Sequence, residues 1–186
     1  MRGAREMEIS LCHFRIRFGL VFLALLATMP VSGADNMYFH GALVAEPCLI
    51  PPGEEVLELD FGTVIDKYLY LNQRTHGQRF QLHLAECDPS ISKTVSVTFT
   101  GSESVELSGL LALDPTSQAS GIAIGIETLE GRTLPIGDSS RAYLLSSGDN
   151  LIEFKAYVRG EPTAIANRNI KRGPFRAVAT FGLEYD

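Results

Sequence analysis

Apolar and polar residues alternate along most of the chain after residue 36, which is the pattern of half-buried β-strands. This alternation, together with β-branched runs, predicts strands at 37–43, 56–61, 80–84, 94–100, 122–127, 151–158 and 175–185. Clusters of Gly, Pro, Asp and Ser lie between these segments and predict turns. No segment has a sustained helical periodicity. Many short strands joined by such turns predict one all-β domain, either a sandwich or a barrel.

The N-terminal region has a different pattern. Arginines precede an apolar run at 18–29, and small residues at 32–34 follow it. A basic region, a short apolar core and a small-residue exit are typical of a secretory signal peptide. The run is shorter than the roughly 20 residues that cross a bilayer. We predict a signal peptide at 1–33, cleaved after Gly33; cleavage after Ala34 fits as well, and a buried N-terminal helix is the alternative.

Composition narrows the class of protein further. The chain has 186 residues, a formal net charge of −6, 45% hydrophobic residues and 20% charged residues. This length and apolar content allow a proper core and exclude a disordered chain. The acidic balance argues against a nucleic-acid-binding surface. We therefore expect a folded, exported protein with no nucleic-acid partner.

The cysteines predict a disulfide. The sequence has three cysteines, and Cys12 leaves with the signal peptide. Cys48 and Cys87 remain, and in an exported chain two cysteines most simply form one disulfide. The chain lacks a Cys-x-x-Cys pair and clustered partners, which a redox or zinc role would need.

Candidate chemistry for an enzyme is absent from the sequence. His40, His76 and His83 are not spaced with each other, or with carboxylates, as metal ligands are. The sequence has no nucleophile elbow, P-loop or H-E-x-x-H motif. We expect no catalytic residues, no metal and no cofactor.

Two segments stand out by their position. In the first, Met37, Phe39, Gly41 and Leu43 share one side of an apolar strand next to the predicted cleavage site. It fits an edge strand of its own sheet or a strand that pairs with another molecule, and the sequence leaves both open. In the second, the last strand keeps its alternation up to Asp186, where most domains end in a few fraying polar residues.

Several motifs in sequence order resemble subunits of chaperone–usher pili, the type 1 and P fimbriae of Gram-negative bacteria. The alternating segment with its central Gly41 runs into Glu-Pro-Cys48, and a short strand at 57–62 ends in Phe-Gly. The strand at 80–87 ends in the second cysteine. Gly173 and Tyr185 match the family's C-terminal glycine and penultimate tyrosine. The resemblance extends over 34–186.

The resemblance implies an incomplete immunoglobulin-like β-sandwich that lacks its last strand and is completed by donor-strand addition. Residues 34–47 would be the N-terminal donor-strand extension, and residues 48–186 the pilin domain. A periplasmic chaperone would first lend a strand, and the extension of an adjacent subunit would replace it at the outer-membrane usher. The subunit would thus pass through the periplasm to the cell-surface fimbrium.

The resemblance also implies roles for individual residues. Met37, Phe39 and Leu43 would insert into the neighbour's groove, and Gly41 would lie where the groove floor comes too close for a side chain. The Asp186 carboxylate would be held by basic residues of the chaperone. The strand lining this subunit's own groove would comprise Gly173, Phe175, Ala177, Ala179, Phe181, Leu183 and Tyr185.

The position in the pilus follows from finer features. The extension 34–47 is short, the mature chain is richer in charge than major rod subunits, and 34–186 leave no room for a separate receptor-binding domain. These features favour a minor or tip adaptor subunit over a rod subunit. The alternative from another class is a free-standing secreted β-sandwich that binds carbohydrate or protein through its loops. It requires 37–44 to pair within its own chain.

Overall fold

The computed structural model describes residue 37 and residues 39–186, so the predicted signal peptide at 1–33 lies outside the described residues. A compact unit extends over Val44–Asp186. The division into an extension at 34–47 and a pilin domain at 48–186 stays a prediction. No helix among the described residues is long and apolar enough to cross a membrane.

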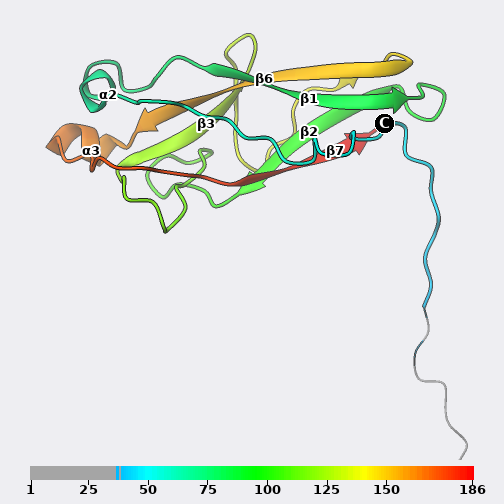
Figure 1. Cartoon of the computed structure of the whole chain (residues 1–186), viewed down its shortest axis with the longest axis horizontal. Helices are drawn as coiled ribbons and strands as arrows, with labels where there is room; N and C mark the ends of the chain where they lie inside the picture. Colours follow the sequence, from blue (N-terminus) through cyan, green and yellow to red (C-terminus); the bar gives the residue numbers. More distant parts are fainter. Residues whose placement is uncertain (1–36, 38) are drawn as a thin grey trace, which may run out of the picture. The chain divides into compact units, whose positions relative to one another are not determined.

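The compact unit contains two antiparallel sheets (Figure 1). One is four-stranded, with the order β1-β6-β3-β4, and the other is three-stranded, with the order β5-β2-β7. All-β architecture is therefore confirmed, as a sandwich rather than a barrel. The strand bounds are β1 Gln78–Cys87, β2 Thr94–Gly101, β3 Ile122–Thr128, β4 Thr133–Leu134, β5 Tyr143–Leu144, β6 Gly148–Gly160 and β7 Ala179–Tyr185.

The main core lies between the sheets and is centred on Phe154 of β6, which is completely buried. Its ring lies 5.1 Å from that of Phe99 in β2 and 5.8 Å from that of Phe80 in β1, measured between centroids. Aromatic rings at such distances and tilts add to the energy of burial. The core thus joins strands of both sheets through one cluster of rings.

A second cluster extends the core around Ile124 and Val158, and a third, smaller cluster covers the outer face of the four-stranded sheet. Tyr157 of β6 is buried there with Ala123, Leu107 and Leu110. Its ring lies across Gly125 of β3, where a Cβ atom would stand 2.2 Å from the tyrosine Cζ. Gly125 is therefore required by this close approach, and the sheet is packed on both faces at this point.

The sequence-based strands at 80–84, 94–100, 122–127 and 151–158 are confirmed within β1, β2, β3 and β6. The strand predicted at 56–61 is wrong: these residues have no strand pairing in the structure. Leu59 and Phe61 do pack against the core, so the alternation correctly indicated which side chains face inward. It could not indicate whether the backbone has a ladder partner, which depends on distant segments.

Two further predicted strands also differ from the structure. The described residues within 37–43 form no strand, and the last strand begins at Ala179 instead of residue 175. The residues before Ala179 are extended, but their backbone bonds to loops: Gln118 and Ala119 donate to the carbonyl of Pro174. A regular ladder cannot form against an irregular loop.

The structure also contains two short helices that the pattern did not predict, α2 (Asp66–Asn72) and α3 (Pro162–Asn167). Each is too short for a helical period to be recognised in the sequence. Tertiary contacts hold α2, since Leu69 is buried and the Tyr70 hydroxyl accepts a hydrogen bond from the backbone of Ile170.

Candidate assembly site

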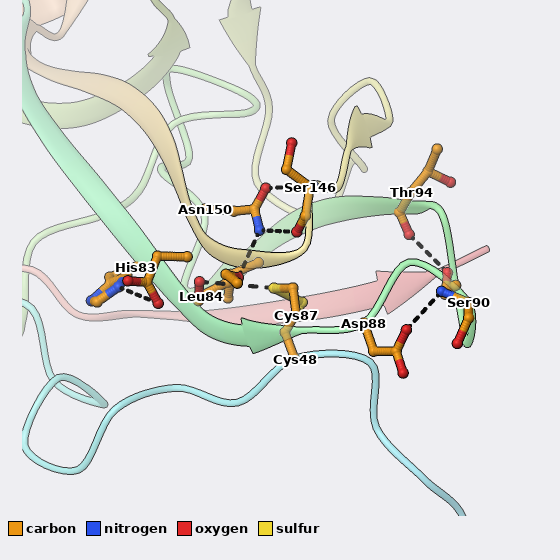
Figure 2. Close-up of a disulfide and its surroundings, with 12 residues drawn as sticks. Cys48, His83, Leu84, Cys87, Asp88, Ser90, Thr94, Ser146 and Asn150 are labelled. Carbon is orange, nitrogen blue, oxygen red and sulfur yellow. Dashed lines mark hydrogen bonds and ion pairs between the residues drawn. A yellow bond between two sulfur atoms is a disulfide. The ribbon is translucent and has the colours of Figure 1, made fainter.

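The predicted disulfide between Cys48 and Cys87 is present (Figure 2). Both cysteines are buried in the main core. Strict alternation would turn Cys87 away from Leu84, but a register shift between these residues, with Glu86 at φ 53°, returns Cys87 to the inner face. This is the effect of a β-bulge. The chain before β1 is thereby attached to the end of the four-stranded sheet.

Hydrogen bonds around the disulfide hold the neighbouring turns (Figure 2). The backbone N–H of Ser90 donates to the Asp88 carboxylate, and the Asn150 amide bridges the turn before β6 through bonds to Ser146 and Gly148. Leu49 exchanges two backbone hydrogen bonds with Ala85. The start of the compact unit is therefore fixed by covalent and hydrogen bonds together.

The predicted groove strand lies at the edge of the three-stranded sheet. β7 pairs with β2 on one side, and no strand pairs with its other side among the described residues. We name as the β7 face the residues whose side chains are half-buried along this segment: Phe175, Ala177, Phe181, Leu183 and Tyr185. All five pack against the core clusters. Ala179, predicted to belong to the same row, is exposed.

A second segment, residues 46–61, comes close to both ends of the β7 face, and we name it the rim segment. The rings of Phe61 and Phe175 lie 6.2 Å apart at one end. At the other end, partial burial and then the charge of Glu46 raise the pKa of Tyr185 above its usual value. The rim segment and β7 exchange no backbone hydrogen bonds within the described part of the chain. The rim segment and β7 therefore come close to each other at both ends of the β7 face without pairing.

The predicted C-terminal positions are held within this chain. Gly173 has φ 150°, and a Cβ atom there would stand 2.7 Å from Gln118 Cβ. The backbone oxygen of Asp186 accepts hydrogen bonds from the Ser92 hydroxyl (2.5 Å) and from the Lys93 and Thr94 N–H groups (both 3.1 Å). Both ends of the segment 173–186 are thus fixed, and its role toward a chaperone stays a prediction.

The predicted donor residues are exposed. Met37, Phe39 and Leu43 are exposed by 68%, 87% and 104%, respectively. A Cβ atom at Gly41 would have no neighbour within 4 Å. The role of this segment as a donor strand stays a prediction.

The histidines take part in polar contacts on the surface. His83 Nδ1 lies 3.0 Å from Glu54 Oε2 and its Nε2 lies 3.8 Å from Asp149, and the Tyr68 hydroxyl lies 3.1 Å from His76 Nε2. His40 is exposed. Among the residues that the structure describes, no group of three or more His, Cys, Asp or Glu side chains could hold a metal ion.

Sequence reasoning missed an ion pair that fixes the chain before the β7 face. Arg172 donates to Asp66 Oδ2 from Nε at 2.9 Å and from Nη2 at 2.7 Å. This contact lowers the pKa of the Asp66 carboxyl. No sequence signal could have indicated it, because the two residues are brought together only by the fold.

Comparison with known proteins identifies the family. The model of the fimbrial protein family matches residues 37–186. The chain belongs to this family. Its members are structural subunits of surface fimbriae and not enzymes, so the predicted identity as a structural, non-catalytic subunit of a cell-surface fimbria is confirmed.

Individual relatives cover almost the whole chain. It is 31% identical to the major MR/P fimbria protein of Proteus mirabilis over 96% of this chain and 99% of that protein. It is 30% identical to the fimbria A protein of Serratia marcescens, covering 91% and 93% of the two chains. The fold is similar to that of the P pilus rod subunit PapA, with a TM-score of 0.65, 23% identity and coverage of 76% and 100%.

Proposed function

We propose that this subunit polymerises by donor-strand exchange, in which the extension of an adjacent subunit adds a strand beside β7. The observation that carries the proposal is that β7 has an unpaired side along a half-buried apolar face. An open apolar edge of this kind is an aggregation hazard in a free-standing domain. β-Augmentation would remove it, since backbone hydrogen bonds give affinity and alternate side chains give specificity.

The rim segment supports the same proposal. It meets the β7 face at Phe61 and near Glu46 but exchanges no backbone hydrogen bonds with β7. An added strand could therefore pair with β7 and cover the side chains between the two segments. The solved structures with a similar fold include a subunit of a chaperone–usher pilus, with a TM-score of 0.65.

This subunit's own extension would complete the next subunit in the same way. Met37, Phe39 and Leu43 lie exposed on an alternating segment, where Gly41 has no contact of its own. Burying three such side chains is worth roughly 5–9 kcal/mol, at about 1.5–3 kcal/mol each. The backbone hydrogen bonds of the added strand would contribute further.

A periplasmic chaperone would occupy the β7 face during transit, and the outer-membrane usher would catalyse the exchange. The apolar edge supports this route, because an unpaired edge needs protection before assembly. The Asp186 carboxylate would meet basic residues of the chaperone, while its backbone remains bonded to the loop at Ser92–Thr94.

Co-expression tests the proposal. We expect the mature chain to accumulate in the periplasm only with its chaperone, as a one-to-one complex by size-exclusion chromatography. A chain that accumulates alone as a monomer with cooperative unfolding would contradict the proposal. It would favour the free-standing sandwich with loop-mediated binding.

A substitution at Gly41 tests the donor role separately. Gly41→Arg should abolish addition to the preceding subunit and leave chaperone binding intact, because the new side chain would face the partner's groove floor. His40→Arg is the matched control, since it adds the same group on the opposite side of the strand. Equal incorporation of both variants into fimbriae would contradict the assignment.

We further propose a minor or tip adaptor position. The short predicted extension and the charged composition, at 20% of the residues, support it. Immunogold labelling of fimbriae should then mark isolated positions or tips. Continuous labelling along the shaft would instead assign the chain to the rod.

A further inference from the structure

A polar pocket lies on the outer face of the four-stranded sheet and shares no residue with the β7 face. Its volume is about 520 Å³, and it lies between the end of α2, the following segment 74–77, and strands β3 and β6. Volumes of this order are typical of small-molecule sites. Its lining includes Glu127, Arg74, Lys155 and Asn72.

A glycine is required in the wall of the pocket by close packing. Gly77 forms part of the wall, and a Cβ atom there would stand 2.6 Å from Glu127 Oε1 and 3.0 Å from Lys155 Cβ. The backbone of Gly77 has no positive φ, so conformation does not explain the residue. The absent side chain lets the Glu127 carboxylate and Lys155 pack directly against the Gly77 backbone in the pocket wall.

That carboxylate is buried but incompletely bonded. The Glu127 side chain is 6% exposed, and its Oε2 accepts a hydrogen bond from Arg74 Nη1 at 2.9 Å. Oε1 accepts no hydrogen bond from the described residues. Every fully buried side-chain nitrogen or oxygen of the described residues has a hydrogen-bond partner, so Oε1 must be accessible to solvent. Water or a ligand hydroxyl in the pocket can therefore donate a hydrogen bond to Oε1.

Donors surround this acceptor. The Arg74 guanidinium stacks 3.5 Å above the centre of the Tyr157 ring. Its Nε and Nη1 donate hydrogen bonds, and its Nη2 donates none to the residues that the structure describes. Lys155 Nζ donates to the carbonyl of Leu129 and has further protons to offer. Asn72 Oδ1 adds a second acceptor at the rim, since only its amide nitrogen is bonded. The pocket thus presents acceptors and cationic donors side by side.

We propose that this pocket binds a neutral carbohydrate through neighbouring hydroxyl groups. A hydroxyl donates one hydrogen bond and accepts others, so one hydroxyl can donate to Glu127 Oε1 while accepting from Arg74 or Lys155. An anionic ligand would meet the Glu127 carboxylate at the pocket floor, and a purely cationic one would meet Arg74 and Lys155. A polyhydroxyl ligand satisfies both kinds of group.

The full mature chain, purified as it accumulates in the periplasm, would be tested on an array of neutral, sialylated and sulfated oligosaccharides. Where a chaperone accompanies the chain, the chaperone alone is the blank. Glu127→Gln should weaken binding to the recognised neutral glycan about tenfold or more, the cost of a charge-assisted hydrogen bond. Glu153→Gln should not change it. Glu153 lies on the same face of β6, outside the pocket, with its side chain 39% exposed.

Asn72→Ala is a second variant for the case that Glu127→Gln fails to fold, and it should weaken binding about threefold by removing the rim acceptor. The thermal unfolding of each variant identifies a folding defect. Absence of binding to any neutral glycan, binding only to sialylated or sulfated glycans, or unchanged binding by folded variants would each overturn the proposal. The array result does not depend on strand exchange, so the two proposals can fail separately.

Discussion

β6 and β7 carry the same alternation of apolar residues, yet the fold covers them to different extents. β6 lies between β1 and β3, and its inward residues Ile152, Phe154, Ala156 and Val158 are each exposed by 5% or less. β7 pairs with β2 alone, and its inward residues at 181, 183 and 185 remain half-buried. The two strands differ in their neighbours and not in their pattern.

This difference shows what alternation can and cannot indicate. It assigns side chains to one face of a strand. How completely that face is buried depends on how many strands and loops cover it. β6 is paired on both sides and its inward face is fully buried, whereas β7 has one unpaired side to which another strand could add.

The largest expected effect separates these two strands directly. Phe154→Ala should lower the free energy of unfolding by about 3–5 kcal/mol, because it leaves a cavity in a fully packed core. Phe181→Ala should cost only about 1–2 kcal/mol, because its side chain is only partly buried. Urea unfolding of dilute protein measures both. Equal costs would mean that β7 is as well covered as β6.

The disulfide should have the next largest effect. Replacing both Cys48 and Cys87 with Ser should cost about 4 kcal/mol by the chain-entropy model, since the bond closes a loop with a sequence separation of 39. The rim segment should be released from β1 as a result. Urea unfolding with and without reductant measures the loss, and Cys12→Ser is the control that should change nothing in the mature chain.

A glycine comparison tests how firmly the chain before β7 is fixed. Gly173→Ala should destabilise by about 1–3 kcal/mol, because φ is 150° and the new methyl group would press on Gln118. Gly182→Ala in β7 is the matched control, since a Cβ atom there meets only the Thr98 oxygen at 4.0 Å. Thermal unfolding distinguishes the two. If Gly173→Ala left the thermal stability unchanged, this segment could rearrange at little energetic cost.

The smallest expected effect is a pH dependence at Tyr185. Its raised pKa means that the native state holds the phenolic proton more tightly than the unfolded state does. Stability should therefore fall as the pH rises through the usual value of 10.0, by a few tenths of a kcal/mol for so exposed a group. Tyr185→Phe should remove this decline between about pH 9 and about pH 11. A strand added beside β7 should raise the pKa further.

Much of the β-structure could be predicted because the alternation of apolar and polar residues along the sequence corresponds to the two faces of a strand. The strands around Phe80, Val97, Ile124 and Phe154 appear where the pattern placed them. The segment 56–61 shows the limit, since its side chains face the core as expected but its backbone has no ladder partner. β4 and β5, with two residues each, are too short to carry a period.

The candidate sites divide in the same way. The residues of the β7 face, the exposed extension and the cysteine pair could all be named from the sequence, because each depends on local spacing or on the resemblance. The pocket at Glu127 could not. Arg74, Gly77 and Glu127 meet there only because α2 and the following segment lie against β3 and β6.

The sequence by itself determined the all-β class, the faces of the main strands, the disulfide partners and the family. These follow from short-range patterns, whose meaning depends on the period of a strand and on residue chemistry. Only the tertiary structure decided that β7 has one neighbour, that the rim segment approaches it without pairing, and that Gly77 packs against Glu127 in the pocket wall. These features depend on contacts between residues far apart in the chain. No local sequence pattern specifies such contacts.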